Sequence, residues 1–385
     1  MTARLIVRCA HGVEWLCADE IANRFPAAEL ITLARRELTF ELPQAGPGCL
    51  ELATADDAFL EVGRVEGAGT TKDALPVVAR RLAALPWRRS IDAVRRLRPV
   101  PDGPTFDVVA SLEGRRSYNR FAVENTFGSI LARLLGGTCL ARTAAGREPG
   151  EPDLTIRVFI REQSATAAIR LGAHPLHRRR YKQETGPGTL HAPVAAALAR
   201  LAAPGPGRPV LDPFCGDGTI MIETGLAYPQ AVLTASDADP ARVASAESNS
   251  RRAGVRVALR VGDAGLVAPA DGPFASIVTN PPWNLAVDAT RSLAGSLDPF
   301  WRRVPDLLAP DGRLVVLTEA ALEVPAALRR AGFTLALATR IRLAGRVAQI
   351  VLAAPPGRQP AAIPQGAARW RERAIAAGVV TRDGF

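Results

Sequence analysis

An asparagine, two prolines and a tryptophan follow one another at Asn280-Pro281-Pro282-Trp283, directly after the apolar run 274–278. The apolar run predicts a buried strand, and the two prolines end it because each fixes φ and lacks a backbone N–H. The loop then offers the side-chain oxygen of Asn280 and the carbonyl of Pro281 as acceptors, with the ring of Trp283 beside them. We interpret this group as a site for a planar base with an exocyclic amino group, on which the ring stacks. A Pro-Pro turn with a buried tryptophan is the alternative.

A glycine-containing segment upstream must position the second ligand of such a reaction. Residues 209–211 predict a short strand, Gly216 and Gly218 permit a tight turn, and residues 219–226 continue at helical spacing. This order is similar to the nucleotide-binding start of a doubly wound α/β fold, in which the ligand lies beyond the carboxyl end of the strand. Neither a phosphate-binding loop nor the dinucleotide fingerprint matches, because Met221 stands where the fingerprint needs its third glycine.

Carboxylates follow two further predicted strands. Residues 231–236 predict a strand that ends at Asp237, and residues 256–261 predict a strand that is followed by Asp263. A carboxylate in the first of these places can accept hydrogen bonds from both hydroxyl groups of a ribose. Taken singly, either aspartate could be an ordinary capping or turn residue, so the interpretation depends on the whole series.

The string Asp-Pro-Phe-Cys-Gly-Asp-Gly-Thr at 212–219, followed by Asn-Pro-Pro-Trp at 280–283, carries a family resemblance. From about residue 205 to 355 the chain resembles class I S-adenosylmethionine-dependent methyltransferases that modify amino groups. The resemblance implies an α/β fold, a Rossmann-like domain with a mostly parallel seven-stranded sheet, and S-adenosylmethionine as cofactor. It implies that Asn280, Pro281, Pro282 and Trp283 are catalytic. It implies cofactor contacts from Asp212, Pro213, Phe214, Gly216, Gly218, Thr219, Asp237, Ala238, Asp263, Ala264, Thr189 and Leu190.

The remainder of this region predicts elements that complete such a sheet. Residues 298–308 predict a helix, residues 310–312 a turn and residues 313–317 a strand. Two runs near the end, 333–338 and 347–353, predict a closing antiparallel pair of strands.

Composition narrows the class of partner. The formal net charge is +10 and the cations are almost all arginine, which binds phosphate with two donors and stacks on bases. A polyanion such as RNA is therefore expected. The five cysteines are scattered, with no zinc-site or disulfide pattern, which fits a reducing cytoplasm and no metal. No apolar run approaches the ~20 residues that span a bilayer, so we expect no membrane partner, and we expect a monomer.

A second resemblance lies before the methyltransferase-like region. Residues 153–160, 167–170 and 176–182 are similar to the end of a THUMP domain, an α+β RNA-binding module found beside RNA-modifying domains. The resemblance implies that the basic exit segment contacts RNA through Arg178, Arg179, Arg180, Tyr181 and Lys182. Arg180 stands where the family usually has glycine, which changes the geometry of this loop.

These observations divide the chain into five expected parts. Residues 1–66, with a helix expected over 13–24 and strands near 31 and 38, resemble the small ferredoxin-like domain that precedes THUMP in such enzymes. The other parts are a THUMP domain (67–182), a linker helix (183–204), the methyltransferase domain (205–355) and a C-terminal tail (356–385) with a helix over 370–377.

We therefore expect methyl transfer to the exocyclic N2 of a guanosine, with tRNA as the RNA that the domain order favours. Alternatives are a ribosomal RNA guanine-N2 methyltransferase, an adenine-N6 methyltransferase, and a non-catalytic RNA-binding protein that retains the fold. Asn284, where the family usually has glycine, leaves open which base enters.

Overall fold

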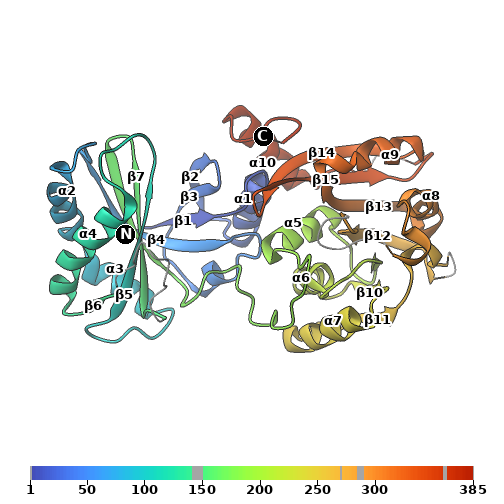
Figure 1. Cartoon of the computed structure of the whole chain (residues 1–385), viewed down its shortest axis with the longest axis horizontal. Helices are drawn as coiled ribbons and strands as arrows, with labels where there is room; N and C mark the ends of the chain where they lie inside the picture. The colour runs from blue at the N-terminus through green and yellow to red at the C-terminus, as the bar shows by residue number, and fades with distance from the viewer. Residues whose placement is uncertain (1, 141–150, 269–270, 284–289, 359–361, 385) are drawn as a thin grey trace.

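The structure, a computed structural model, describes residues 2–140, 151–268, 271–283, 290–358 and 362–384. Two β-sheets organise these residues, one of eight strands before residue 171 and one of seven strands after residue 208. Figure 1 shows the sheets at opposite sides of an elongated molecule, joined by an extended segment and the helix α5 (Ala192–Ala202).

The first sheet is continuous from edge to edge. Its strands are, in spatial order, β2 (Glu29–Ala34), β3 (Glu37–Leu42), β1 (Ala3–Arg8), β4 (Asp57–Glu66), β8 (Ser164–Arg170), β7 (Leu154–Arg161), β5 (Thr105–Leu112) and β6 (Thr138–Cys139). Pairing is antiparallel as far as β7, while β5 is parallel to β7 and β6. The ten-residue strand β4 pairs with β1 on one side and β8 on the other, so it joins the two parts of this sheet. The expected division at residue 66 stays a prediction.

Helices cover this sheet in two groups. The helix α1 (Glu14–Arg24) and the 3-10 turn η1 (Pro47–Leu50) belong to the part around β1 and β3. The part around β5 and β7 carries α2 (Ala74–Ala83), α3 (Trp87–Arg95) and α4 (Arg120–Leu135). Trp87 is fully buried against Phe127 of α4, with 5.6 Å between the ring centroids, so the basic faces of these helices rest on a packed core.

The second sheet has the topology that the sequence predicts for a Rossmann-like methyltransferase fold. Its strands are, in spatial order, β11 (Ala258–Val261), β10 (Val232–Asp237), β9 (Pro209–Asp212), β12 (Phe274–Thr279), β13 (Leu308–Glu319), β15 (Arg346–Ala354) and β14 (Thr334–Leu343). All pairs are parallel except those made by β15. The predicted fold class is confirmed.

Alternation along each strand decides which helices pack on which face, because successive side chains of a strand point to opposite faces. Val210, Val278 and Val315 join the core under α5, α6 (Thr219–Ala227) and α7 (Pro240–Ala253). Their neighbours Leu211 and Ile277 join the core under α8 (Asp298–Leu307) and α9 (Val324–Arg330). Both faces are thus buried, as a parallel sheet requires.

One predicted turn differs from the structure. The sequence predicts a turn at 310–312 and a strand from 313, whereas β13 already begins at Leu308. Phe274 pairs with Leu308 and Ser276 with Arg313, so the residues between form an irregularity inside the strand. Pairing with β12 on both sides of this irregularity extends the strand past the proline and glycine.

The described part of the C-terminal tail folds back onto the N-terminal part. The helix α10 (Gln365–Ala376) begins before the predicted residue 370 and packs on α1. The indole of Trp370 lies against Ala18, Ile21 and Phe40. Among the described residues, no helix is long and apolar enough to cross a bilayer.

Candidate active site

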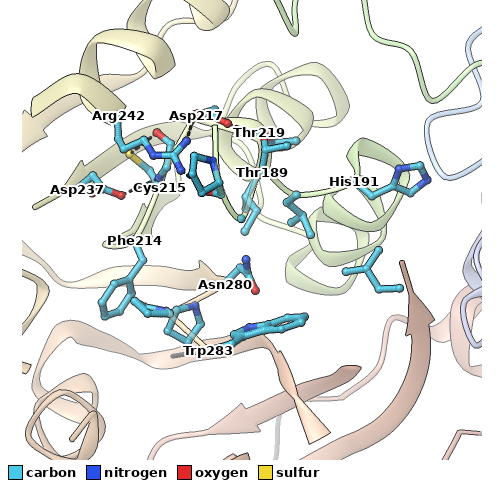
Figure 2. A pocket seen from close by; sticks show the side chains of 18 of the residues that line it. Thr189, His191, Phe214, Cys215, Asp217, Thr219, Asp237, Arg242, Asn280 and Trp283 are labelled. Atoms are coloured by element: carbon cyan, nitrogen blue, oxygen red, sulfur yellow. Dashed lines mark hydrogen bonds and ion pairs between the residues drawn. The ribbon is translucent and has the colours of Figure 1, made fainter. Parts of the chain in front are cut away.

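A cavity of about 1250 Å³ opens at the carboxyl ends of β9, β10, β11 and β12 and extends to the N-terminal part of the chain. Pockets for one small ligand usually measure about 300–1,000 Å³. The cavity therefore has room for a cofactor and a second molecule at the same time. Figure 2 shows Asp237 and His191 at opposite ends of it, with Asn280 between them in this view.

The loop after β9 forms one wall. Gly216 and Gly218 have φ of 50° and 80°, a conformation that favours glycine. A Cβ on Gly218 would lie 3.0 Å from the Cβ of Ala246, so this glycine also lets the loop approach α7 closely. Gly216 has no neighbour at that distance and lines the cavity, which leaves its backbone open to a ligand. Gly218 is not among the residues that line the cavity, and its cofactor contact stays a prediction.

Asp212 is likewise placed behind the cavity wall. Its side chain is fully buried and does not line the cavity, although the sequence predicts a cofactor contact. One carboxyl oxygen accepts from the hydroxyl of Thr279 at 2.7 Å and from the N–H of Phe214 at 3.1 Å. Burial raises the pKa of this carboxyl group to about 7. Asp212 thus ties the glycine loop to the strand that ends at the Asn-Pro-Pro loop.

Asp237 lies where the sequence places it, at the end of β10 on the cavity. Its two oxygens accept from the N–H of Gly216 at 2.9 Å and from the N–H of Asp239 at 3.0 Å. Two backbone donors fix the carboxylate, and its remaining lone pairs can accept from the hydroxyl groups of a ligand.

Asp263 follows β11 and also lines the cavity. It accepts from the N–H of Gly265 at 2.9 Å and from both the N–H and the hydroxyl of Ser292. These bonds lower the pKa of Asp263 against the opposing effect of its burial, so the group stays ionised. Ala238 and Ala264, each one residue beyond these aspartates, line the same region.

The segment 183–189, which enters the cavity from the N-terminal side, is fastened to the glycine loop and α7. Asp217 accepts from the N–H of Gly186 at 3.2 Å and from the hydroxyl of Thr189. Its other oxygen accepts from Arg242 at 2.6 Å, and Arg242 also donates to the carbonyl of Pro187. We call this segment the strap. Thr189 and Leu190 reach the cavity as predicted, but the two charged residues that hold the strap were not predicted to do so.

The Asn-Pro-Pro-Trp loop forms the middle of the cavity. The side-chain oxygen of Asn280 is buried and has no hydrogen-bond partner among the described residues. The indole N–H of Trp283 is also buried without a hydrogen-bond partner among the described residues. The rings of Pro281 and Pro282 line the cavity wall beside it. Buried polar atoms without partners are rare and point to a ligand that satisfies them. Asn284 lies outside the described residues.

Cys215 provides the one sulfur on the cavity wall among the described residues. Burial raises the pKa of this thiol well above its ordinary value. The neutral thiol is a poor nucleophile, since the thiolate is the reactive form. Among the described residues no group of three or more His, Cys, Asp or Glu side chains could hold a metal.

Three residues of the basic exit segment make hydrogen bonds within the protein. Arg179 donates to Glu223 of α6 at 2.8 Å, and the hydroxyl of Tyr181 donates to the same carboxylate at 2.7 Å. Lys182 donates to the carbonyl of Leu190 and lines the cavity. The guanidinium group of Arg179 and the hydroxyl group of Tyr181 both bind Glu223, so these two side chains connect the exit segment to α6. Arg178 and Arg180 are exposed, and the RNA contact of this segment stays a prediction.

The far end of the cavity comes from parts of the chain to which the sequence analysis gave no role. Ala10, Arg36 and Asp56 belong to the N-terminal part, His177 and His191 flank the strap, and residues 342–346 form the tip of the β14–β15 hairpin. Asp56 accepts from His191 at 2.7 Å, and its carbonyl accepts from the N–H of His177 at 3.0 Å. Only tertiary structure brings these residues together, so no local signal could have identified them.

Residues 179–349 match the model of a protein family described as RMKL-like, methyltransferase domain. They form a methyltransferase domain. The family resemblance that the glycine loop and the Asn-Pro-Pro-Trp loop predict is confirmed.

Known proteins resemble the chain beyond this domain. It is 29% identical over 330 residues to the tRNA (guanine(6)-N2)-methyltransferase of Thermus thermophilus, a match that covers 84% of this chain and 91% of that protein. The crystal structure of TrmN from Thermus thermophilus has a TM-score of 0.73 and 27% identity, covering 92% of this chain and 99% of that one. A Listeria monocytogenes protein, named a predicted N6-adenine-specific DNA methylase, has a TM-score of 0.68 at 19% identity, covering 92% and 97%. The last likeness shows the fold alone.

The methyltransferase domain uses S-adenosylmethionine as its methyl donor, in keeping with its class I fold. The cavity fits a nucleoside-containing cofactor, because a carboxylate held by two N–H groups and an open glycine backbone meet at one end. The assignment of individual cofactor contacts to Pro213, Phe214, Thr219, Asp237 and Asp263 stays a prediction.

Proposed function

We propose that this protein transfers a methyl group from S-adenosylmethionine to the exocyclic N2 of a guanosine in tRNA, as a monomer in the cytoplasm. The observation that carries the proposal is the buried oxygen of Asn280, which has no partner among the described residues. A hydrogen-bond acceptor fits the N–H groups of an exocyclic amine, and it would be left unsatisfied by a substrate that lacks them.

The residues of the loop account for the chemistry. S-adenosylmethionine supplies a methyl group on a positively charged sulfur, which is a good leaving group. The amine of a base is a poor nucleophile because its lone pair is delocalised into the ring. Asn280 and the carbonyl of Pro281 would accept from its two N–H groups and hold the nitrogen in line with the methyl group. The new N–C bond forms as the C–S bond breaks, and the amine proton then leaves to water.

Trp283 supplies the second element of recognition. Its ring lines the cavity beside Asn280, where it can stack on a base that has left its helix (Figure 2). Stacking of a base on an aromatic ring contributes roughly 1–3 kcal/mol. The part of the cavity that a bound cofactor would leave free has room for such a nucleotide.

The choice of RNA rests on the molecule outside the methyltransferase domain. The chain has a net charge of +10, and Arg88, Arg89 and Arg96 are exposed on α3 or at its end. We propose that this part is a THUMP-like domain that binds the RNA backbone. The relative named tRNA (guanine(6)-N2)-methyltransferase covers both parts of the chain, which supports tRNA and guanine N2 over the alternatives.

Incubation with unmodified tRNA and labelled S-adenosylmethionine, followed by nucleoside analysis, tests the proposal. The expected product is N2-methylguanosine. Formation of N6-methyladenosine would show that the protein is an adenine-N6 methyltransferase. Methylation of ribosomal RNA without methylation of tRNA would show that ribosomal RNA is the substrate. Failure to methylate either RNA, with S-adenosylmethionine bound, would contradict the proposed function.

A further inference from the structure

The cavity is charged differently at its two ends. At the cofactor end, the methyltransferase domain contributes four carboxylates and one arginine, Arg242, which is paired with one of them; the carboxylates are Asp217, Asp237, Asp239 and Asp263. At the far end, three guanidinium groups and one carboxylate, Asp56, line the cavity; the guanidinium groups belong to Arg36, Arg342 and Arg346. Carboxylates suit the hydroxyl groups and positive charge of the methyl donor, whereas guanidinium groups suit phosphate. The far end is therefore chemically unlike a cofactor site.

The three arginines come from two separate parts of the chain. Arg36 lies in the turn between β2 and β3, and Arg342 and Arg346 flank the tip of the β14–β15 hairpin. In Figure 1 this hairpin extends from the second sheet toward α1. The cavity mouth at this end is thus bordered by both halves of the molecule.

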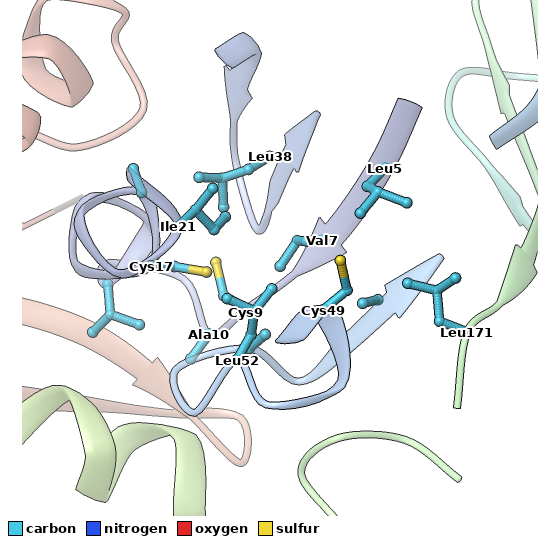
Figure 3. Packing of buried hydrophobic residues seen from close by; sticks show 14 of the residues in the cluster. Leu5, Val7, Cys9, Ala10, Cys17, Ile21, Leu38, Cys49, Leu52 and Leu171 are labelled. Atoms are coloured by element: carbon cyan, nitrogen blue, oxygen red, sulfur yellow. The ribbon is translucent and has the colours of Figure 1, made fainter. Parts of the chain in front are cut away.

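Backbone contacts fix the two sides of this mouth. The N–H of Arg342 donates to the carbonyl of His11 at 2.9 Å. A Cβ on Gly12 would lie 2.5 Å from the carbonyl oxygen of Arg340, so the hairpin and the loop 10–12 touch backbone to backbone. Ala10 belongs to the same buried cluster as Val7, Cys9 and Leu52, as Figure 3 shows. The mouth is therefore preformed.

Two of these guanidinium groups, those of Arg36 and Arg346, are largely exposed to solvent. The side chains of Arg36 and Arg346 are 54% and 55% exposed. Arg36 lies 3.9 Å from Asp56, and Arg346 lies 3.4 Å from Glu319. The carboxylates are 17% and 20% exposed, but the separations are long and the arginines face solvent, so each ion pair is weak and a phosphate can compete for the guanidinium group.

We propose that Arg36 and Arg346 bind the phosphates that flank the nucleotide in the cavity, so that the two halves of the molecule together hold the RNA strand at the reacting base. The proposal rests on the proposed function, because it takes the second ligand of the cavity to be an RNA nucleotide. It explains why the hairpin docks on the N-terminal part, since each side alone would offer an incomplete site.

The test is the binding of fluorescently labelled, unmodified tRNA at several salt concentrations, with S-adenosylhomocysteine present. We expect Arg36→Gln and Arg346→Gln each to raise the Kd about tenfold and to lower the slope of log Kd against log salt by about one. Arg36→Lys keeps the charge and should keep the slope. Arg330→Gln, an exposed arginine on α9 away from the cavity, is the matched control and should leave both quantities unchanged.

Two further measurements separate a phosphate contact from other roles. The Kd for S-adenosylmethionine should stay at the wild-type value in all variants, and the loss of activity should appear in KM for tRNA more than in kcat. Wild-type Kd and salt slope in Arg36→Gln and Arg346→Gln, beside a wild-type enzyme that methylates tRNA, would overturn this inference and leave the proposed function standing. A wild-type protein that neither binds nor methylates RNA would overturn both.

Discussion

Asn280 is the residue to which we assign the central role in the proposed chemistry. Its side-chain oxygen is buried and has no partner among the described residues, so in the proposed mechanism its loss removes an acceptor for the substrate amine. We expect Asn280→Ala to lower kcat about 100-fold or more while the Kd for S-adenosylmethionine stays within a factor of about two. Single-turnover methylation and calorimetry measure the two quantities.

Asn280→Asp is the informative companion of this variant. It keeps an acceptor oxygen at the same position and should retain more activity than the alanine variant. Equal activity of Asn280→Ala and the wild type would remove Asn280 from the mechanism.

The raised pKa of Asp212 predicts that the free energy of unfolding depends on pH. Its pKa is about 7 in the folded protein and near its ordinary value of 3.8 in the unfolded chain. Between these two pH values the folded protein therefore binds more protons than the unfolded chain. The contribution of Asp212 to the free energy of unfolding is fully present below pH about 4 and is lost as the pH rises through 7. The free energy of unfolding should fall from pH 5 to pH 8, and Asp212→Asn should flatten this decline.

The matched control for this experiment is the exposed Asp311, whose pKa is lowered mainly by its hydrogen bond with Arg208. Its titration lies below the tested range, so Asp311→Asn should leave the decline unchanged. Parallel curves for Asp212→Asn and the wild type would show that Asp212 is ionised in the folded protein.

Among the elements, the strap has the clearest testable role. Asp217 and Arg242 hold it over the cavity, and both are largely buried. Arg242→Gln removes the ion pair and the bond to the carbonyl of Pro187, so the strap loses part of its support. We expect the Kd for S-adenosylmethionine to rise about tenfold, which corresponds to the roughly 1.4 kcal/mol of one such interaction. Calorimetry checks this.

Arg251 offers a control on the same helix. It is exposed and forms an ion pair with Glu247, one turn away on α7. Arg251→Gln changes the net charge equally and should bind S-adenosylmethionine as the wild type does. A similar loss in both variants would attribute the effect to charge and not to the strap.

The sequence predicts elements better than it predicts what holds them together. The sheet of the methyltransferase domain, Asp237 and the Asn-Pro-Pro-Trp loop follow from local patterns, because hydrophobic periodicity, prolines and glycines act within a few residues. Arg179 was assigned to RNA because a run of arginines gives no indication of the direction of each side chain. Its partner Glu223 lies 44 positions away, and only the fold brings them together.

At the scale of the whole molecule, Glu223 joins three parts of the chain. It binds Arg179 and Tyr181, and Arg179 also donates to the carbonyl of Ala53 in the N-terminal part at 2.5 Å. Glu223→Ala would leave the charge of Arg179 buried without a carboxylate, which costs about 3–5 kcal/mol. We expect denaturant unfolding to show this loss, together with a smaller one of about 1 kcal/mol for Tyr181→Phe.

Arg178, the exposed neighbour of Arg179, is the control for this pair. Its substitution by alanine should leave the free energy of unfolding within about 0.5 kcal/mol of the wild type. Loss of stability in Arg178→Ala as large as in Glu223→Ala would show that the junction does not depend on the buried carboxylate.

The strand β4 has a consequence for how the protein can be divided. Because β4 pairs with β1 on one side and β8 on the other, a fragment that ends at Glu66 would expose one whole side of β4, and the complementary fragment would expose β8. Open strand edges of this length are templates for aggregation. Fragments for expression should therefore keep residues 2–170 intact, and chimaeras that exchange the N-terminal part between relatives should be joined after β8 and not within the sheet.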